Sequence, residues 1–188
     1  MVERTIGFLK MKFQLRFFPI LNLPMLFKNK LTKEQALEKI KHYCSYQERC
    51  HSEVKGKLYS FGLRKSETEE IIAKMIEDNY LNEERFAIQY AGGKFRMKHW
   101  GRKKIQYELQ QKGISAFIIK IALKEIEEKK YAETLQKLAQ TKWESLEGEH
   151  YLLRQSKTTA YLIQKGYEQG LISQVLQEIR SGKNSDKL

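Results

Sequence analysis

The feature that most constrains this 188-residue chain is a glycine that recurs about every 50 residues behind the same apolar pattern. The three glycines are Gly62, Gly113 and Gly166. The positions four and eight residues before them hold Leu58, Leu109 and Leu162, then Val54, Ile105 and Thr158. Positions i and i+4 share one face of a helix, and glycine readily takes the left-handed conformation that ends a helix. Each glycine is therefore predicted to end a helix with one buried face.

Two further helices are predicted in each unit. Apolar residues with helical spacing follow each glycine, at Ile71, Ile72 and Met75, at Ala122, Leu123 and Ile126, and at Val175, Leu176 and Ile179. Similar stripes precede it, at Ala36, Leu37, Ile40 and Cys44, at Phe86, Ala87, Tyr90 and Ala91, and at Ala132, Leu135, Leu138 and Ala139. The sequence predicts an all-α fold of three tandem three-helix repeats, residues 31–80, 81–129 and 130–182. A repeat of this length predicts an elongated, curved body with mainly local cores.

Helix starts are predicted from capping residues. Thr32 with Gln35, and Ser66 with Glu69, have the spacing of capping boxes. Asn82 and Ser115 follow an apolar residue and precede a helical stripe. They are predicted to be N-caps with hydrophobic staples, between Leu81 and Phe86 and between Ile114 and Ile119.

The two ends of the chain are expected to lie outside the repeats. Residues 1–30 contain an apolar run, Phe17 to Phe27, which is interrupted by prolines and too short to span a bilayer. We expect this N-terminal extension to be disordered or dispensable, with translation starting at Met1, Met11 or Met25. Residues 183–188 are predicted to form a short tail.

Positive charge is concentrated in the second repeat. The chain has 35 Lys and Arg against 23 Asp and Glu, a net charge of +12, which favours acidic partners such as nucleic acid, an acidic protein face or anionic lipid. Half of that excess lies around Trp100, where Glu108 is opposed by Lys94, Arg96, Lys98, Arg102, Lys103, Lys104 and Lys112. Gly101 is expected to break the helix, so that these cations surround a turn.

This basic turn has two interpretations. It is either a solvated turn whose cations aid solubility or a surface that faces an anion, and we favour the second because the charge is so dense. No base-reading element is apparent, so DNA, single- or double-stranded, would be bound without sequence preference. Trp100 either packs on its own unit or stacks on a partner. We assign Phe86, Tyr90, Ile105, Tyr107 and Leu109 to packing.

Neither a catalytic nor a metal site is predicted. The sequence contains no phosphate-cradling glycine loop, no HExxH motif and no nucleophile elbow. His42, Cys44, Cys50 and His51 lie close together, but their spacing does not match paired zinc ligands. Two cysteines make no disulfide framework, which is typical of a reducing cytoplasm. We therefore expect a cytoplasmic non-enzyme without cofactor, metal, small-molecule ligand or membrane partner.

One long motif resembles a known family. The segment from Tyr80 to Ile114, "YLNEERFAIQYAGGKFRMKHWGRKKIQYELQQKGI", is similar to the central signature of the RecX family, regulators of the RecA recombinase. The stretches "RCHSEVKGKLYSFGL" and "KTTAYLIQKGYEQGLISQVL" resemble its first and last repeats. Two features depart from the family pattern, the residues before Leu31 and Gly56, which lies inside a predicted helix at a cost of about 1 kcal/mol.

The resemblance implies a small bacterial protein that lies along the groove of the RecA–DNA filament. It would mainly inhibit the recombinase and so modulate recombination, the SOS response and DNA repair. The alternative is a general nucleic-acid-binding helical protein with no dedicated recombinase partner. The sequence leaves open whether such a protein caps filament ends, occupies the groove or promotes disassembly.

Overall fold

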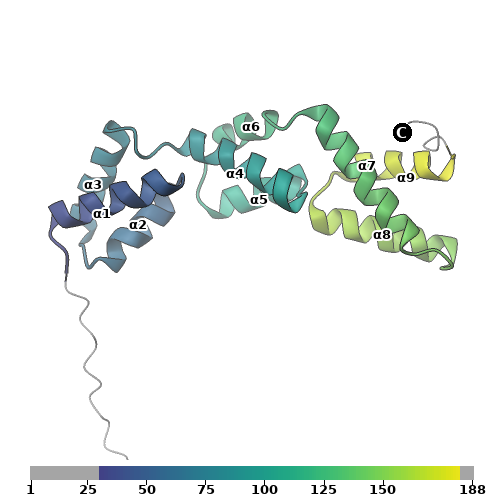
Figure 1. The fold of residues 1–188 in the computed structure, drawn as a ribbon, viewed down its shortest axis with the longest axis horizontal. Helices are drawn as coiled ribbons and strands as arrows, with labels where there is room; N and C mark the ends of the chain where they lie inside the picture. Colours follow the sequence, from purple (N-terminus) through teal and green to yellow (C-terminus); the bar gives the residue numbers. More distant parts are fainter. Residues whose placement is uncertain (1–29, 183–188) are drawn as a thin grey trace, which may run out of the picture.

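The computed structural model describes residues 30–182, and the predicted all-α fold is confirmed there. These residues form nine helices and no strand. The helices are α1 (Lys33–Tyr46), α2 (His51–Ser60), α3 (Lys65–Glu77), α4 (Glu83–Lys98), α5 (Arg102–Gln111), α6 (Ala116–Lys124), α7 (Glu128–Glu144), α8 (Tyr151–Lys165) and α9 (Gln169–Arg180). They form three groups of three, which follow one another along an elongated body (Figure 1). We call these groups the first, second and third units. The expectations for residues 1–29 and 183–188 fall outside the described residues.

The repeated glycines end the middle helix of each unit as predicted. Gly62, Gly113 and Gly166 have positive φ angles of 84°, 84° and 94°. The residue after each glycine donates its N–H to the carbonyl of the repeated leucine, from Leu63 to Leu58, from Ile114 to Leu109 and from Tyr167 to Leu162. This is the Schellman arrangement, in which a buried residue packs back on the last helical turn. The leucine thus fills the core and accepts the closing hydrogen bond.

Most of the predicted helix caps are also confirmed. Thr32 and Gln35 form a reciprocal capping box, and the side chains of Asn82 and Ser115 accept hydrogen bonds from N–H groups in the first turns of their helices. The box predicted at Ser66 was wrong. Helix α3 begins at Lys65, because Glu67 accepts a hydrogen bond of 2.6 Å from the N–H of Arg64 and so moves the start upstream.

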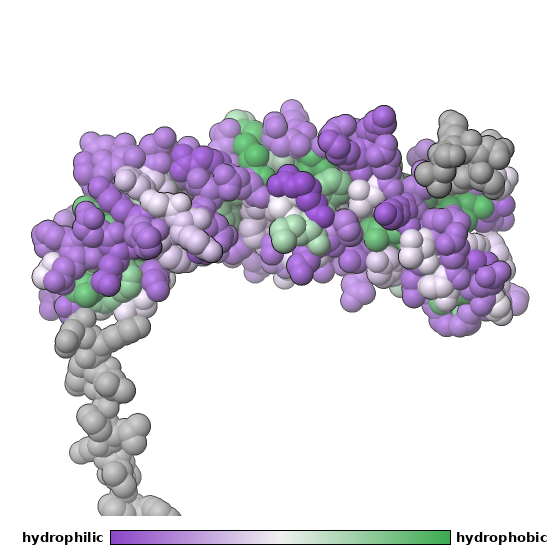
Figure 2. Space-filling view, viewed as in Figure 1, coloured by the Kyte–Doolittle hydropathy of each residue, from purple (hydrophilic) through white to green (hydrophobic). Residues whose placement is uncertain are grey.

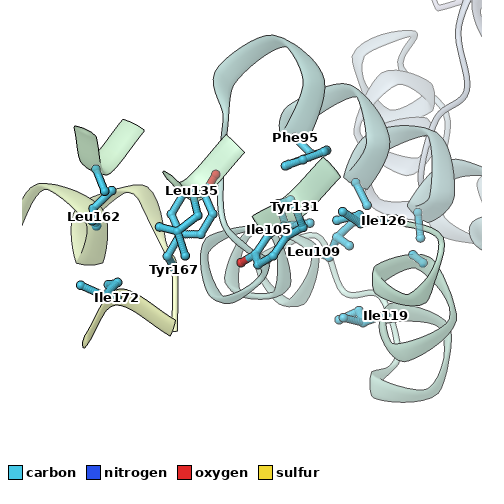
Figure 3. Packing of buried hydrophobic residues seen from close by; sticks show 14 of the residues in the cluster. Phe95, Ile105, Leu109, Ile119, Ile126, Tyr131, Leu135, Leu162, Tyr167 and Ile172 are labelled. Atoms are coloured by element: carbon cyan, nitrogen blue, oxygen red, sulfur yellow. The ribbon is translucent and has the colours of Figure 1, made fainter. Parts of the chain in front are cut away.

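The apolar residues form two cores, whereas the repeat pattern predicted mainly local ones. One core lies within the first unit and also contains Leu81. The other includes Cys50 of the first unit and runs through the second and third units, from Phe86 on α4 to Leu176 on α9. Figure 3 shows part of it, including Phe95, Tyr131 and Ile172. The staple predicted between Leu81 and Phe86 was therefore wrong, because the two side chains lie in different cores.

Two packing assignments were also wrong. Tyr107 is 58% exposed because it lies two residues from both Ile105 and Leu109, on the opposite face of α5. Ala132 is exposed, and its neighbour Tyr131 is buried instead. The buried face of α7 repeats every four residues, at Tyr131, Leu135, Ala139 and Trp143.

Candidate polyanion-binding surface

The turn between α4 and α5 carries the candidate site and is held against the third unit. Helix α4 ends at Lys98, and His99 takes a left-handed conformation with a φ of 52°. Gly101 then caps α5, and its N–H donates to the carbonyl of Lys165 at 2.9 Å. A Cβ atom at Gly101 would come within 2.2 Å of the carbonyl oxygen of Gly166. Only glycine fits this contact, so the break predicted at Gly101 also fixes the turn against the end of α8.

Trp100 positions two of the predicted cations. Its indole is partly buried and packs against the shared core of the second and third units. The ammonium of Lys94 lies 5.1 Å from the ring centroid and that of Lys104 lies 4.7 Å from it. Contacts of this kind attract a cation to the face of an aromatic ring. Trp100 thus packs on its own part of the fold and orients two lysines at the surface, whereas stacking on a partner stays a prediction.

Arg102 is bound within the chain. Its guanidinium forms two hydrogen bonds with the carboxylate of Glu128, at 2.8 and 3.2 Å, and donates to the carbonyl of Ile126. It also lies over the ring of Tyr131, 4.2 Å from the centroid, and only 18% of the side chain is exposed. Arg102 therefore joins α5 to the start of α7, and its donors are largely occupied.

Lys112 is bound between the first and second units. Its ammonium lies 2.7 Å from the carboxylate of Glu53 on α2, and its carbonyl accepts a hydrogen bond from the hydroxyl of Ser52. Burial acts to lower the pKa of Lys112, but Glu53 outweighs it and the pKa is raised. Arg85 pairs with Glu48 across the same joint. Together with the pairing of His51 and Glu83, these contacts connect the two units.

An aromatic ladder stiffens the other joint. The rings of Phe95, Tyr131 and Tyr167 follow one another with centroid distances of 5.7 and 5.1 Å, leading from α4 through α7 to the loop before α9 (Figure 3). The hydroxyl of Tyr131 donates to Glu168 at 2.7 Å and accepts from the N–H of Arg102 at 2.9 Å. Burial raises the pKa of Tyr131 well above its usual range, and Glu168 adds to this, so the hydroxyl stays protonated and keeps donating.

Five predicted cations remain available to an external anion. Among residues 30–182, no carboxylate pairs with the side chains of Lys94, Arg96, Lys98, Lys103 or Lys104. They lie on the last turns of α4 and the first turn of α5. Their mutual repulsion is unfavourable unless an anion or solvent screens it. The structure therefore divides the predicted basic set into joint residues and a smaller group with free ammonium and guanidinium donors.

Lys165 is a basic residue of this surface that sequence reasoning missed. Its ammonium donates to the carbonyl of Lys98 at 3.3 Å, and Lys104 donates in turn to the carbonyl of Gln164 at 3.4 Å. The repeat itself held a signal, because Lys165 precedes Gly166 as Lys112 precedes Gly113. In both joints the carbonyl of that lysine accepts a hydrogen bond from the start of the preceding unit's middle helix.

Metal binding, thiol chemistry and membrane insertion would be alternative roles for residues 30–182. Residues 30–182 bring together no group of three His, Cys, Asp or Glu side chains suited to a metal ion. Cys44 and Cys50 are buried free thiols, and burial raises the pKa of Cys44 to about 11. None of the helices in this range has both the length and the apolar character needed to cross a bilayer.

Comparison with known proteins identifies the fold. The family model for the second three-helix domain of RecX matches residues 82–123, and that for the third matches residues 128–176. Regulatory protein RecX of Bacillus thuringiensis (strain Al Hakam) is 28% identical over 145 residues, which are 77% of this chain and 54% of that protein. The chain thus spans about half the length of the curated relatives it matches.

Two solved structures of RecX proteins have the same fold as this chain. The crystal structure of RecX from Lactobacillus salivarius is similar with a TM-score of 0.72 and 28% identity, over 79% of this chain and 96% of that one. A second crystal structure, of a regulatory protein RecX, shares the fold with a TM-score of 0.71 at 24% identity, over 78% of this chain and 73% of that one. The motif around the basic turn, the two domain models and the common fold all give the same assignment: the chain belongs to the RecX family of regulatory proteins.

Proposed function

We propose that the chain regulates the RecA recombinase, mainly as an inhibitor, by binding along the RecA–DNA filament. The observation that carries the proposal is the group of unpaired cations in the middle of an elongated body. A filament of recombinase and DNA is a long polyanion, and a rod with a basic centre is complementary to it in shape and in charge. Membership of the RecX family supports the same partner.

Regulation is proposed to work through binding alone, without catalysis, cofactor or small-molecule ligand. Five cations with free donors offer contacts to phosphate or carboxylate groups, while the joints hold the units in line. Lysine ammonium groups contribute field and single hydrogen bonds, and Arg96 adds a planar fork that suits phosphate or carboxylate. Binding of this kind would modulate recombination, DNA repair and the SOS response by limiting filament assembly or activity.

The decisive experiment is an ATPase titration of the organism's own RecA on single-stranded DNA, with and without this protein. We expect inhibition at protein concentrations far below those that saturate the DNA. The inhibition should persist when excess DNA is supplied. Inhibition that disappears with excess DNA would instead support the alternative, a nucleic-acid-binding protein that merely competes for DNA.

A pair of charge variants tests the basic turn in the same assay. The double variant Lys103→Glu with Lys104→Glu should raise the concentration for half-inhibition by about tenfold or more, because it reverses two cations with no carboxylate partner. The control variant Lys120→Glu with Lys124→Glu changes the net charge equally on α6. Circular dichroism checks that both remain helical. Equal effects of the two variants would remove the basic turn from the mechanism.

A further inference from the structure

A second group of cations lies in a groove of the third unit. The groove has a volume of about 420 Å³ and lies along α7, where Tyr161 of α8 and His99 complete its lining. Its lining includes His99, Thr134, Lys137, Thr141, Lys142 and Tyr161. None of these positions was singled out by the sequence pattern, since the lysines are spread over α7 with no dense charge run around them.

Two lysines line this groove, Lys137 and Lys142, and Lys165 lies beside it, near the ring of Tyr161. Within residues 30–182, no carboxylate pairs with Lys137, Lys142 or Lys165. The ammonium groups of Lys142 and Lys165 both lie near the ring of Tyr161, 5.9 and 5.7 Å from its centroid. Two positive groups that share one ring repel each other, and this arrangement becomes favourable when an anion binds between or beside them.

The groove is continuous with the basic turn of the second unit. His99 belongs to that turn and also lines the groove. Lys165 donates to the carbonyl of Lys98, and Lys104 reaches back to the carbonyl of Gln164. The backbone contact between Gly101 and Gly166 holds the two parts together. The cationic surface therefore crosses the joint between the second and third units.

We propose that the groove binds the phosphates of a nucleic-acid strand that continues from the basic turn, with Lys137, Lys142 and Lys165 as the contact residues. This inference rests on the proposed function and extends its DNA contact into the third unit. The groove offers hydroxyl and ammonium donors, each of which satisfies one phosphate oxygen. Every lining side chain except Leu138 carries a hydroxyl, imidazole or ammonium group and none is a carboxylate, a set of groups that suits phosphate oxygens along a strand.

The test measures the salt dependence of binding to a labelled oligothymidine by fluorescence anisotropy. The groove variant replaces Lys137, Lys142 and Lys165 with Gln. The matched control replaces Lys120, Lys124 and Lys129 with Gln. These three lysines also lack carboxylate partners among residues 30–182 and lie outside the groove. We expect the groove variant to lose about 2 from the slope of log affinity against log salt, since each single-strand phosphate contact contributes about 0.7. Its affinity should fall at least tenfold, and that of the control by less than threefold.

Each other outcome overturns the groove assignment. Equal losses in the two variants would show that only net charge matters. Unchanged oligothymidine binding by the groove variant, together with weaker inhibition of the RecA ATPase, would assign the groove to an acidic protein surface instead. If the triple variant loses helicity, Lys137→Glu replaces it, because the side chain of Lys137 is exposed and forms no hydrogen bond or ion pair with residues 30–182. An unchanged affinity in that variant would contradict the proposal.

The same assays separate this inference from the proposed function. If the wild-type protein binds oligothymidine through the groove but leaves the RecA ATPase unaffected, the regulator proposal is contradicted. The proposal that the groove binds nucleic acid would then still hold. If the wild-type protein inhibits RecA, and the groove variant binds oligothymidine and inhibits RecA as the wild type does, the regulator proposal holds. The proposal that the groove binds nucleic acid would then be contradicted.

Discussion

Glycine serves two different physical purposes in this chain. At Gly62, Gly113 and Gly166 the backbone has a positive φ angle, which residues other than glycine rarely adopt. Gly101 has an ordinary φ of −75°, and its requirement is one of space, because its Cα lies against the backbone of Gly166. The first role ends helices within a unit, whereas the second sets how closely two units approach.

A Gly101→Ala substitution should therefore destabilise the joint between the second and third units. The added methyl group overlaps a carbonyl oxygen that cannot move without shifting α8, and overpacking of this kind costs about 1–3 kcal/mol. The free energy of unfolding in urea measures the loss. Gly56→Ala is the control, because Gly56 lies exposed inside α2 with open space around it. That change should stabilise α2 by up to about 1 kcal/mol. A Gly101→Ala protein as stable as the wild type would contradict the steric account.

Residues whose role depends on their immediate neighbours could be predicted from the sequence. The capping box at Thr32 and the helix-ending glycines rest on hydrogen bonds that span a few residues. Arg102 could not be assigned in this way. Its partner Glu128 lies 26 residues away, so a side chain that the sequence offered as an anion contact turns out to hold two helices together.

At the level of elements, Arg102 and Lys103 are neighbours with opposite environments. The guanidinium of Arg102 contacts Glu128, the carbonyl of Ile126 and the ring of Tyr131. The side chain of Lys103 is exposed and has no carboxylate partner among the described residues. At the start of α5, Arg102 therefore holds the joint with α7, and the next residue, Lys103, lies on the surface with its ammonium available to a partner.

Single substitutions should separate these two tasks. Arg102→Gln removes a partly buried contact with Ile126 and α7 and should cost about 1–3 kcal/mol of folding free energy, from its lost hydrogen bonds and cation–π contact. Lys103→Gln should stay within about 0.5 kcal/mol of the wild type and weaken inhibition of RecA instead. Urea denaturation and the ATPase titration read the two effects. If Lys103→Gln proved the more destabilising of the two, the division between joint and surface would be wrong.

Helices were easier to predict than the way they join. The periodicity of apolar residues predicted three helices in every unit, because each stripe is set within one helix. The joints depend on pairs such as Arg85 with Glu48, 37 residues apart, and Arg102 with Glu128, 26 residues apart. An alignment of the repeats assigns each of these residues to a position within its own unit. It contains no information on which residue of the neighbouring unit that side chain contacts.

For the whole molecule, the two cores imply two cooperative blocks. The first unit has a core of its own. It contacts the second unit through ion pairs and through the buried Cys50, which packs in the core shared by the second and third units. The second and third units share one core, an aromatic ladder and a backbone contact. The basic turn and the groove both lie on this larger block, so their relative position is fixed by its core.

Two equivalent leucines provide the test of this division. Leu58 and Leu162 are both fully buried and stand four residues before a repeat glycine, so replacing either with Ala should cost about 2–5 kcal/mol. Leu162→Ala should lower hydrogen-exchange protection in α4–α6 as well as in α7–α9, because the second and third units open together. Leu58→Ala should lower protection in α1–α3 and leave α7–α9 unchanged. Exchange measured by mass spectrometry distinguishes these patterns, and protection lost from only α7–α9 in the Leu162→Ala protein would mean that the third unit opens alone.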